Sequence, residues 1–188
     1  NIRASLKLML LVLASSAAMG IAATVFLRGL EFVTSLREAH LWLFALIPLV
    51  TVGTAWVYRR YGKESALGNN LVIESAVTGK HIPLRMAPLI LIATWATHLV
   101  GGSAGREGTA VQMGGAIAEN IGQRFKLAGH DHEALVLSGI SAAFGAVFGT
   151  PLAGAFFGLE MCFVGRLDYR AVLYCLAASF TGDAVGLA

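Results

Sequence analysis

The chain has 188 residues, of which 56% are hydrophobic, only 13% are charged and 22 are glycines. This composition is that of a membrane protein and leaves no room for a separate soluble domain. The net charge is only +3, and the basic residues flank apolar segments instead of forming a patch, which excludes nucleic acid as a partner.

Five windows of the sequence contain no Asp, Glu, Lys or Arg. In chain order they are Leu8–Leu27, Leu41–Tyr58, Met86–Gly105, Ala134–Leu159 and Ala171–Gly182. The first four are long enough to cross a bilayer, because about 20 apolar residues suffice. The first window is too long for the core of a signal peptide, and we interpret it as a retained span.

Basic residues flank the first two windows and predict the topology. Arg3 and Lys7 precede the first window, and Arg59, Arg60 and Lys63 follow the second. The loop between the two windows has two arginines that are balanced by two glutamates. Positive flanks are retained on the cytoplasmic side, so we expect an integral membrane protein with a cytoplasmic N-terminus.

One apolar piece, Gly108–Ala118, is too short for a simple span because Glu107 and Glu119 bound it. Discontinuous helices of this kind place their ends in the middle of the membrane, where they can meet a substrate. We therefore expect broken helices, and not only simple spans, in this part of the chain.

The fourth window is longer than one span and is interrupted at Gly149, Thr150 and Pro151. Glycine followed by a proline in the first turn of a helix predicts two helices joined by a tight break. Three glycine pairs also have the spacing that lets helix backbones approach closely. They are Gly101/Gly105, Gly145/Gly149 and Gly154/Gly158.

An ionisable pair, Arg106 and Glu107, stands between glycines at the start of an apolar segment. Charges in such a place are costly, which favours a functional role. The free backbone N–H groups at the start of a helix bind anions without a full positive charge. The sequence therefore predicts a site for a small anion with Glu107 as the competitor of that anion. The alternative is that Glu107 pairs with Arg106 or caps the helix.

Three segments together resemble the CLC family of chloride channels and anion/proton antiporters. They are Gly68–Glu74 (GNNLVIE), Gly105–Gly115 (GREGTAVQMGG) and Gly149–Gly154 (GTPLAG), which continues to Glu160. The resemblance implies an all-α polytopic membrane protein with tilted and discontinuous helices. It also implies that residues 1–188 are the first of two inverted repeats, that the second repeat is missing from this sequence, and that the protein is a homodimer in a bacterial inner membrane.

The same resemblance implies roles for single residues. Glu107 would be the external gate, whose carboxylate competes with the anion and carries the proton. Arg106 could instead only hold its loop. A candidate proton route at the end of the third motif is Glu160, although a charged helix end is the simpler interpretation. The residues implied to line the anion pathway are Asn69, Asn70, Gly105, Arg106, Gly108 and Thr109, with Gly149, Thr150 and Pro151 of the third motif.

Three departures from the family pattern favour fluoride over chloride. Thr109 replaces a proline and restores a backbone N–H, and Asn70 stands where a serine coordinates the anion. Met161 replaces the second of two glutamates that chloride/proton antiporters commonly have. The fluoride-selective branch resembles this chain at the last two positions. We therefore expect a fluoride/proton antiporter, with a chloride channel or chloride/proton antiporter as the alternative. Thr109 as a tolerated helix start and Asn70 as a helix N-cap remain open.

Other classes of function have weaker support. Ser103 lies in a G-x-S-x-G pattern typical of serine hydrolases, but His98 is poorly spaced to reach it and no strand precedes it, so we interpret His98 as a satisfied polar residue. A membrane scaffold without transport would leave Glu107 unexplained. Cys162 and Cys175 have no metal-ligand spacing and predict structural thiols. We expect no metal and no cofactor.

Overall fold

The computed structural model describes residues 2–162 and 169–186, and within these ranges it contains helices and loops but no strand. The predicted all-helical fold is therefore confirmed. The helices in chain order are α1 (Ile2–Ala39), η1 (Leu41–Leu46), α2 (Ile47–Val57), η2 (Tyr58–Gly62), η3 (Lys63–Leu67), α3 (Asn69–Thr78), α4 (Met86–Leu99), α5 (Arg106–Arg124), α6 (His130–Phe148), α7 (Pro151–Glu160) and α8 (Val172–Gly186).

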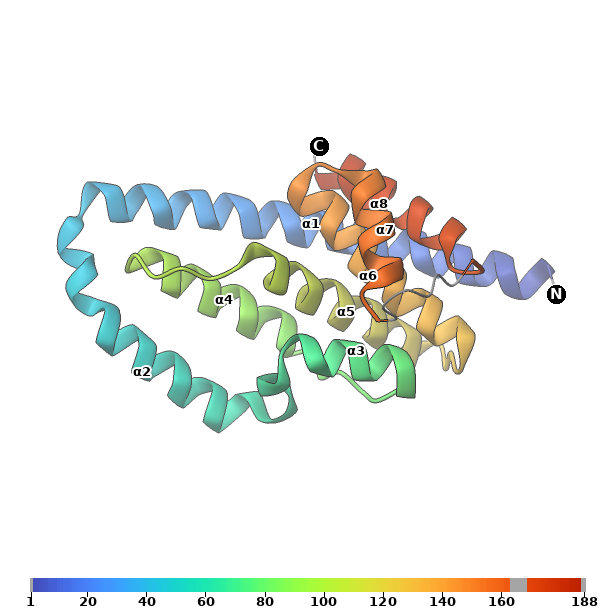
Figure 1. Ribbon diagram of the computed structural model, residues 1–188, viewed down its shortest axis with the longest axis horizontal. Coiled ribbons are helices and arrows are strands. Elements are labelled where there is room, and N and C mark those ends of the chain that lie inside the picture. Colours follow the sequence, from blue (N-terminus) through green and yellow to red (C-terminus); the bar gives the residue numbers. More distant parts are fainter. Residues whose placement is uncertain (1, 163–168, 187–188) are drawn as a thin grey trace.

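Helix α1 runs along the long axis of the molecule, and α5 runs beside it in the opposite direction (Figure 1). Arg106 at the start of α5 lines a groove with Glu38 at the end of α1. At the other end, the Lys7 ammonium lies 5.9 Å from the centroid of the Phe125 ring, just beyond α5. Helix α5, with half as many residues as α1, thus has its start beside the last third of α1 and its end toward the start of α1.

Helix α6 forms the centre of the fold, and α1, α5, α7 and α8 pack around it. Small residues allow this packing. A Cβ atom added at Gly139 would overlap the Cβ of Ala118, and one at Gly154 would lie 2.7 Å from the backbone N of Gly145. A Cβ at Gly158 would lie 2.7 Å from the carbonyl of Leu137. The close approach predicted for Gly154 and Gly158 is confirmed.

The pair Gly101/Gly105 does not have the predicted role in helix packing. Helix α4 ends at Leu99, so the third apolar window gives a helix of 14 residues and not a full span. Gly101 adopts a positive φ of 84° in the loop that follows, and Gly105 is the N-cap of α5. Consecutive glycines lower the stability of a helix and permit a left-handed turn, which explains why the helix stops here.

The expected short piece Gly108–Ala118 is instead part of a continuous helix, because α5 has 19 residues and includes both of the flanking glutamates. Glu119 is buried inside this helix and does not end it. The break in the fourth window is confirmed: Gly149 caps α6 in the left-handed conformation, and Pro151 begins α7.

Within the described residues, two helical stretches are long and apolar enough to cross a membrane, namely Ile2–Ala39 and Leu41–Leu67. Most of the second stretch is exposed in the chain, and Trp42, Leu49 and Trp56 lie on its surface. A large uncovered apolar surface of this kind is typical of contact with lipid or with another protein segment. Cys162 and Cys175 form no disulfide within the described residues, in agreement with the predicted thiols.

Candidate functional site

The start of α3 meets the first turns of α5 through polar side chains. The Nε2 of Gln112, on α5, donates a hydrogen bond of 3.2 Å to the Oδ1 of Asn69, the first residue of α3. Gln112 is only 8% exposed, so this amide pair is largely removed from solvent. An amide pair in such a place has a fixed geometry, because an unpaired buried amide would be costly.

Two glycines lie at this junction. Gly68 is the N-cap of α3 and has a φ of 59°, which glycine adopts without strain. A Cβ atom at Gly108 would lie 3.7 Å from the Nδ2 of Asn69. The Asn69 amide therefore lies beside the first turn of α5, with room for a Cβ atom between it and Gly108.

The N-terminus of α5 has no side-chain cap. In a helix that begins after Gly105, the N–H groups of Gly105, Arg106, Glu107 and Gly108 lack partners within the helix. The Oε2 of Glu107 lies 3.0 Å from the position that a Cβ of Gly105 would take. Glycine at this position thus leaves room for the Glu107 carboxylate beside the start of its own helix, where the helix dipole favours a negative charge.

Arg106 and Glu107 separate in space. Arg106 is exposed and lines a groove with the α1 residues Leu27, Leu30, Glu31, Thr34, Ser35 and Glu38. Within residues 2–162 and 169–186, Arg106 forms no ion pair with Glu107 within 4.0 Å. The arginine thus lies beside α1, where its charge faces two glutamates, and a role in holding the loop agrees with this position.

The Thr109 hydroxyl faces α4. It is hydrogen-bonded at 2.9 Å to the hydroxyl of Thr94 and donates to the Gly105 carbonyl at 3.2 Å. Thr109 is 1% exposed. Thr109 is the fourth residue of α5. The backbone N–H at this position is the first that can form a hydrogen bond within the helix, so it is not one of the free N–H groups at the helix start. Its role at an anion remains a prediction.

Asn69 and Asn70 differ in their surroundings. Asn69 is partly buried and contacts α5, whereas Asn70 is exposed. From the sequence we predicted Asn70 at the position that coordinates the anion, but the structure brings Asn69 to the start of α5. Of the two adjacent amides, Asn69 is therefore the better candidate for the anion site in this chain.

The third motif lies apart from this junction. Thr150 is the N-cap of α7 and is exposed, and α7 packs mainly on α6 and α8. Glu160 is exposed at the end of α7. The structure of this chain thus brings together the first two motifs and leaves the third at a separate helix start.

Gln112 was missed by the sequence interpretation. Its signal was present, because it is a lone amide within the apolar stretch of α5, four residues after Gly108. Positions four apart lie on one helix face, so the contact of Gly108 with Asn69 predicts one for Gln112. His98 is satisfied as predicted, since its Nδ1–H donates to the Thr94 carbonyl at 2.9 Å, while Ser103 is exposed.

Comparison with known sequences identifies relatives of the chain. Residues 50–188 match the sequence model of the voltage gated chloride channel family. The chain is 46% identical over 170 residues to the chloride/fluoride channel protein of Pseudomonas syringae pv. tomato, covering 90% of this chain and 38% of that protein. It is 32% identical over 127 residues to the H(+)/Cl(-) exchange transporter ClcA of Vibrio cholerae, covering 64% of this chain and 27% of that protein.

Comparison with solved structures also identifies CLC-type proteins as similar to this chain. A CLC-type fluoride/proton antiporter matches with a TM-score of 0.91 and 36% identity over 96% of this chain and 46% of that one. A slow cyanobacterial Cl-/H+ antiporter shares the fold, with a TM-score of 0.77 and 18% identity over 95% of this chain and 45% of that one. The chain spans less than half the length of each of these relatives. The predicted CLC fold of discontinuous helices is confirmed, and the chain belongs to the voltage gated chloride channel family.

Proposed function

We propose that this chain is the first half of a proton-coupled fluoride exporter in which Glu107 is the gate. The observation that carries the proposal is the uncapped start of α5, where the Glu107 carboxylate lies against Gly105. The names of two relatives, a chloride/fluoride channel protein and a CLC-type fluoride/proton antiporter, support it. The family consists of channels and exchangers and not of enzymes, which removes the serine hydrolase alternative.

A carboxylate and an anion compete for the same helix start. When Glu107 is charged, its oxygens occupy the place where the N–H groups of α5 would hold an anion. When Glu107 is protonated, it leaves that place, because a neutral acid gains less from the helix dipole. Anion entry and proton binding at Glu107 are thereby linked. This linkage converts an anion gradient into proton movement in the opposite direction.

The amide of Asn69 suits fluoride. Its oxygen already accepts a hydrogen bond from Gln112, which leaves the Asn69 NH₂ group to donate. Fluoride holds its water tightly and must find dense, strong donors to replace that shell. An amide NH₂ offers two donors where a serine hydroxyl offers one. Asn69 thus provides the anion-coordinating side chain that we predicted at Asn70.

The proposal is tested by Glu107→Gln in the full-length protein in lipid vesicles. Glutamine keeps the size of the side chain but cannot carry a proton, so proton uptake driven by outward fluoride flux is expected to be lost. Glu64→Gln serves as the matched control, because Glu64 is exposed in the first turn of η3, away from α5. If Glu107→Gln still moved protons against their gradient, the gate assignment would fail.

Chloride is the second candidate substrate, and the resemblance to the H(+)/Cl(-) exchange transporters favours it. Both candidates use the same gate and differ in the donors around the anion. Fluoride and chloride efflux from the same vesicles separates them. We also propose a homodimer in a bacterial inner membrane, with the N-terminus in the cytoplasm and a second inverted repeat that completes the pathway.

A further inference from the structure

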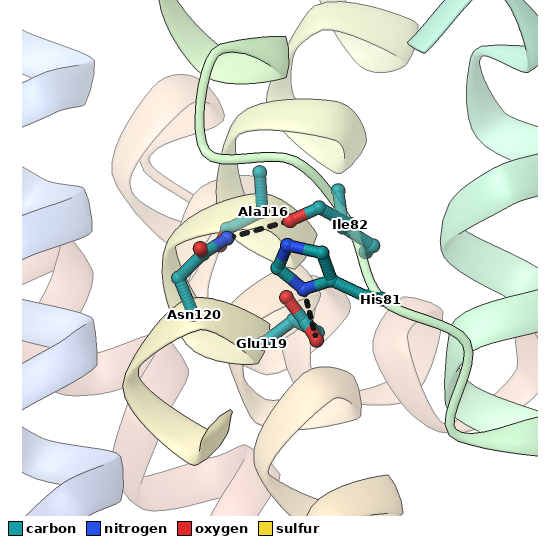
Figure 2. A network of polar contacts seen from close by, with 5 residues as sticks. All are labelled: His81, Ile82, Ala116, Glu119 and Asn120. Carbon is teal, nitrogen blue, oxygen red and sulfur yellow. Dashed lines mark hydrogen bonds and ion pairs between the residues drawn. The ribbon is translucent and has the colours of Figure 1, made fainter. Parts of the chain in front are cut away.

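A buried carboxylate lies near the opposite end of α5 from Glu107. Glu119 is 0% exposed, and its Oε1 accepts a hydrogen bond of 3.1 Å from the Nδ1 of His81 (Figure 2). Its Oε2 has no hydrogen-bond partner in the part of the chain that the structure describes. The His81 side chain, in the loop before α4, is 54% exposed. One oxygen of a buried acid is thus joined to a ring that reaches solvent.

A second buried group lies near this end of α5. His132, near the start of α6, is 4% exposed, and its Nε2 has no hydrogen-bond partner among residues 2–162 and 169–186. A Cβ atom at Gly122 would lie 3.6 Å from the Cδ2 of the His132 ring. Gly122 is three residues after Glu119, and residues three apart share a helix face. The ring edge that bears Nε2 is therefore on the same face of α5 as Glu119.

Electrostatics agree with this placement. His132 precedes the apolar window 134–159. Burial lowers the pKa of its imidazole, and the charge of Glu119 opposes that effect. A buried neutral imidazole with a free ring nitrogen can accept a proton or a hydrogen bond. His81, Glu119 and His132 are thus three protonatable groups at this end of α5, of which His81 reaches solvent and the other two are buried.

The loop that bears His81 has other anchors. The Nδ2 of Asn120 donates hydrogen bonds of 2.8 Å to the carbonyls of Ile82 and Ala116 (Figure 2). Lys80 pairs with Glu74 at 2.9 Å. The loop therefore has a bond to α5 and one to α3 besides its contact with Glu119.

Other charged groups on the neighbouring elements have contacts of their own or are exposed. His130 lies 3.9 Å from Glu133 on α6, and the Lys7 ammonium of α1 lies over the Phe125 ring. Arg85 is exposed at the start of α4. Two titratable groups interact with Glu119, namely His81 through a hydrogen bond and His132 through its charge.

A charged carboxylate without a full set of partners is expensive to bury, at several kcal/mol per ion. In membrane proteins, ionisable residues that are buried in spite of this energetic cost are typical of ion and proton pathways. Glu119 follows Glu107 by 12 residues, which is about 18 Å along a helix. It lies toward the end of the molecule at which α1 begins, because Phe125 contacts Lys7 there.

We propose that Glu119 is a proton-exchange site that opens to the side of the membrane on which α1 begins, with His81 as its connection to water. In the exchange, the proton on Oε1 of the protonated Glu119 moves along the hydrogen bond to Nδ1 of the neutral His81 ring. This step leaves a carboxylate and an imidazolium, and the exposed ring then releases a proton to water. The inference rests on the proposed proton-coupled transport, in which protons enter as fluoride leaves, and it provides the exit of these protons at the end of α5 remote from Glu107.

The test measures proton uptake per fluoride released by the full-length protein in vesicles. Glu119→Gln keeps the size of the side chain and its acceptor for His81 but cannot titrate. We expect the proton-to-fluoride ratio to fall about tenfold or more while fluoride efflux continues, a loss typical of removing a positioned proton donor. An unchanged ratio overturns the inference.

Two matched controls separate proton exchange from loop anchoring. Asn120→Ala removes hydrogen bonds that hold the same loop, and Glu74→Gln removes a neighbouring carboxylate at the surface. Both are expected to keep the wild-type ratio. If Asn120→Ala lowered the ratio as much as Glu119→Gln did, the role of Glu119 would be structural and the inference would be wrong.

Two further outcomes are distinct. If Glu119→Gln does not fold, as judged by gel filtration, the His81→Gln variant tests the inference instead, because His81 is half-exposed. Loss of its imidazole ring must then lower the ratio of protons to fluoride. An unchanged ratio in His81→Gln then overturns the inference. If the wild-type protein itself moves no protons, the proposed function fails, whereas coupling in both the wild type and Glu119→Gln refutes only the role of Glu119.

Discussion

Replacement of Gln112 by leucine tests whether the amide pair between α3 and α5 shapes the anion site. Leucine fills nearly the same volume but removes the Nε2 donor that holds the Asn69 oxygen at 3.2 Å. A neutral hydrogen bond of this kind contributes about 1 kcal/mol. Because a difference of about 1.4 kcal/mol changes an equilibrium tenfold, we expect fluoride affinity to fall about fivefold.

The assay is titration calorimetry of the purified full-length protein with sodium fluoride. Gln123→Leu is the matched control, because Gln123 is an exposed glutamine near the end of the same helix. Asn69→Ala and the double variant with Gln112→Leu complete a cycle whose coupling energy is expected to be about 1 kcal/mol. If the two single effects simply add, the hydrogen bond does not contribute to the anion site and the reasoning is refuted.

The remaining predictions concern selectivity and packing. Asn69→Ser is expected to reduce the preference for fluoride over chloride in efflux assays more than Asn70→Ser does, and the reverse order would contradict our assignment. Gly139→Ala is expected to lower the stability of the folded protein by about 1–3 kcal/mol, because the added Cβ would overlap α5. Gly53→Ala is the control, because an added Cβ there would have nothing within 4 Å. Equal melting temperatures of the two variants in detergent would argue against this packing. Thr109→Val should cost about 1 kcal/mol of stability yet leave fluoride affinity nearly unchanged, since its hydroxyl faces α4; a large affinity loss would return Thr109 to the site.

Local rules were enough to predict some features of the fold. The break between α6 and α7 follows from Gly149 and Pro151, because glycine adopts the left-handed cap and proline fits the first helical turn. The same local logic failed at Gly101 and Gly105. Their spacing equals that of Gly154 and Gly158, but the spacing has meaning only inside a helix, and here the helix has already ended.

Long-range contacts could not be predicted from the sequence. Which of the adjacent residues Asn69 and Asn70 faces α5 depends on the rotation of α3, which tertiary packing sets. Glu119 was interpreted as the boundary of an apolar piece because its partner, His81, is 38 residues away in the sequence. A charge inside an apolar segment signals either a helix end or a paired buried group, and only the fold distinguishes these two cases.

The central claim, that fluoride and protons are exchanged through Glu107, is tested most directly by the wild-type protein. Vesicles that contain the full-length protein and a high internal fluoride concentration are placed in fluoride-free buffer at equal pH, and internal pH is recorded during efflux. The account predicts that protons enter against the gradient they create, so that the interior becomes more acidic, and that Glu107→Gln abolishes this change. Fluoride efflux with no change in internal pH would show an uncoupled channel and would contradict the account.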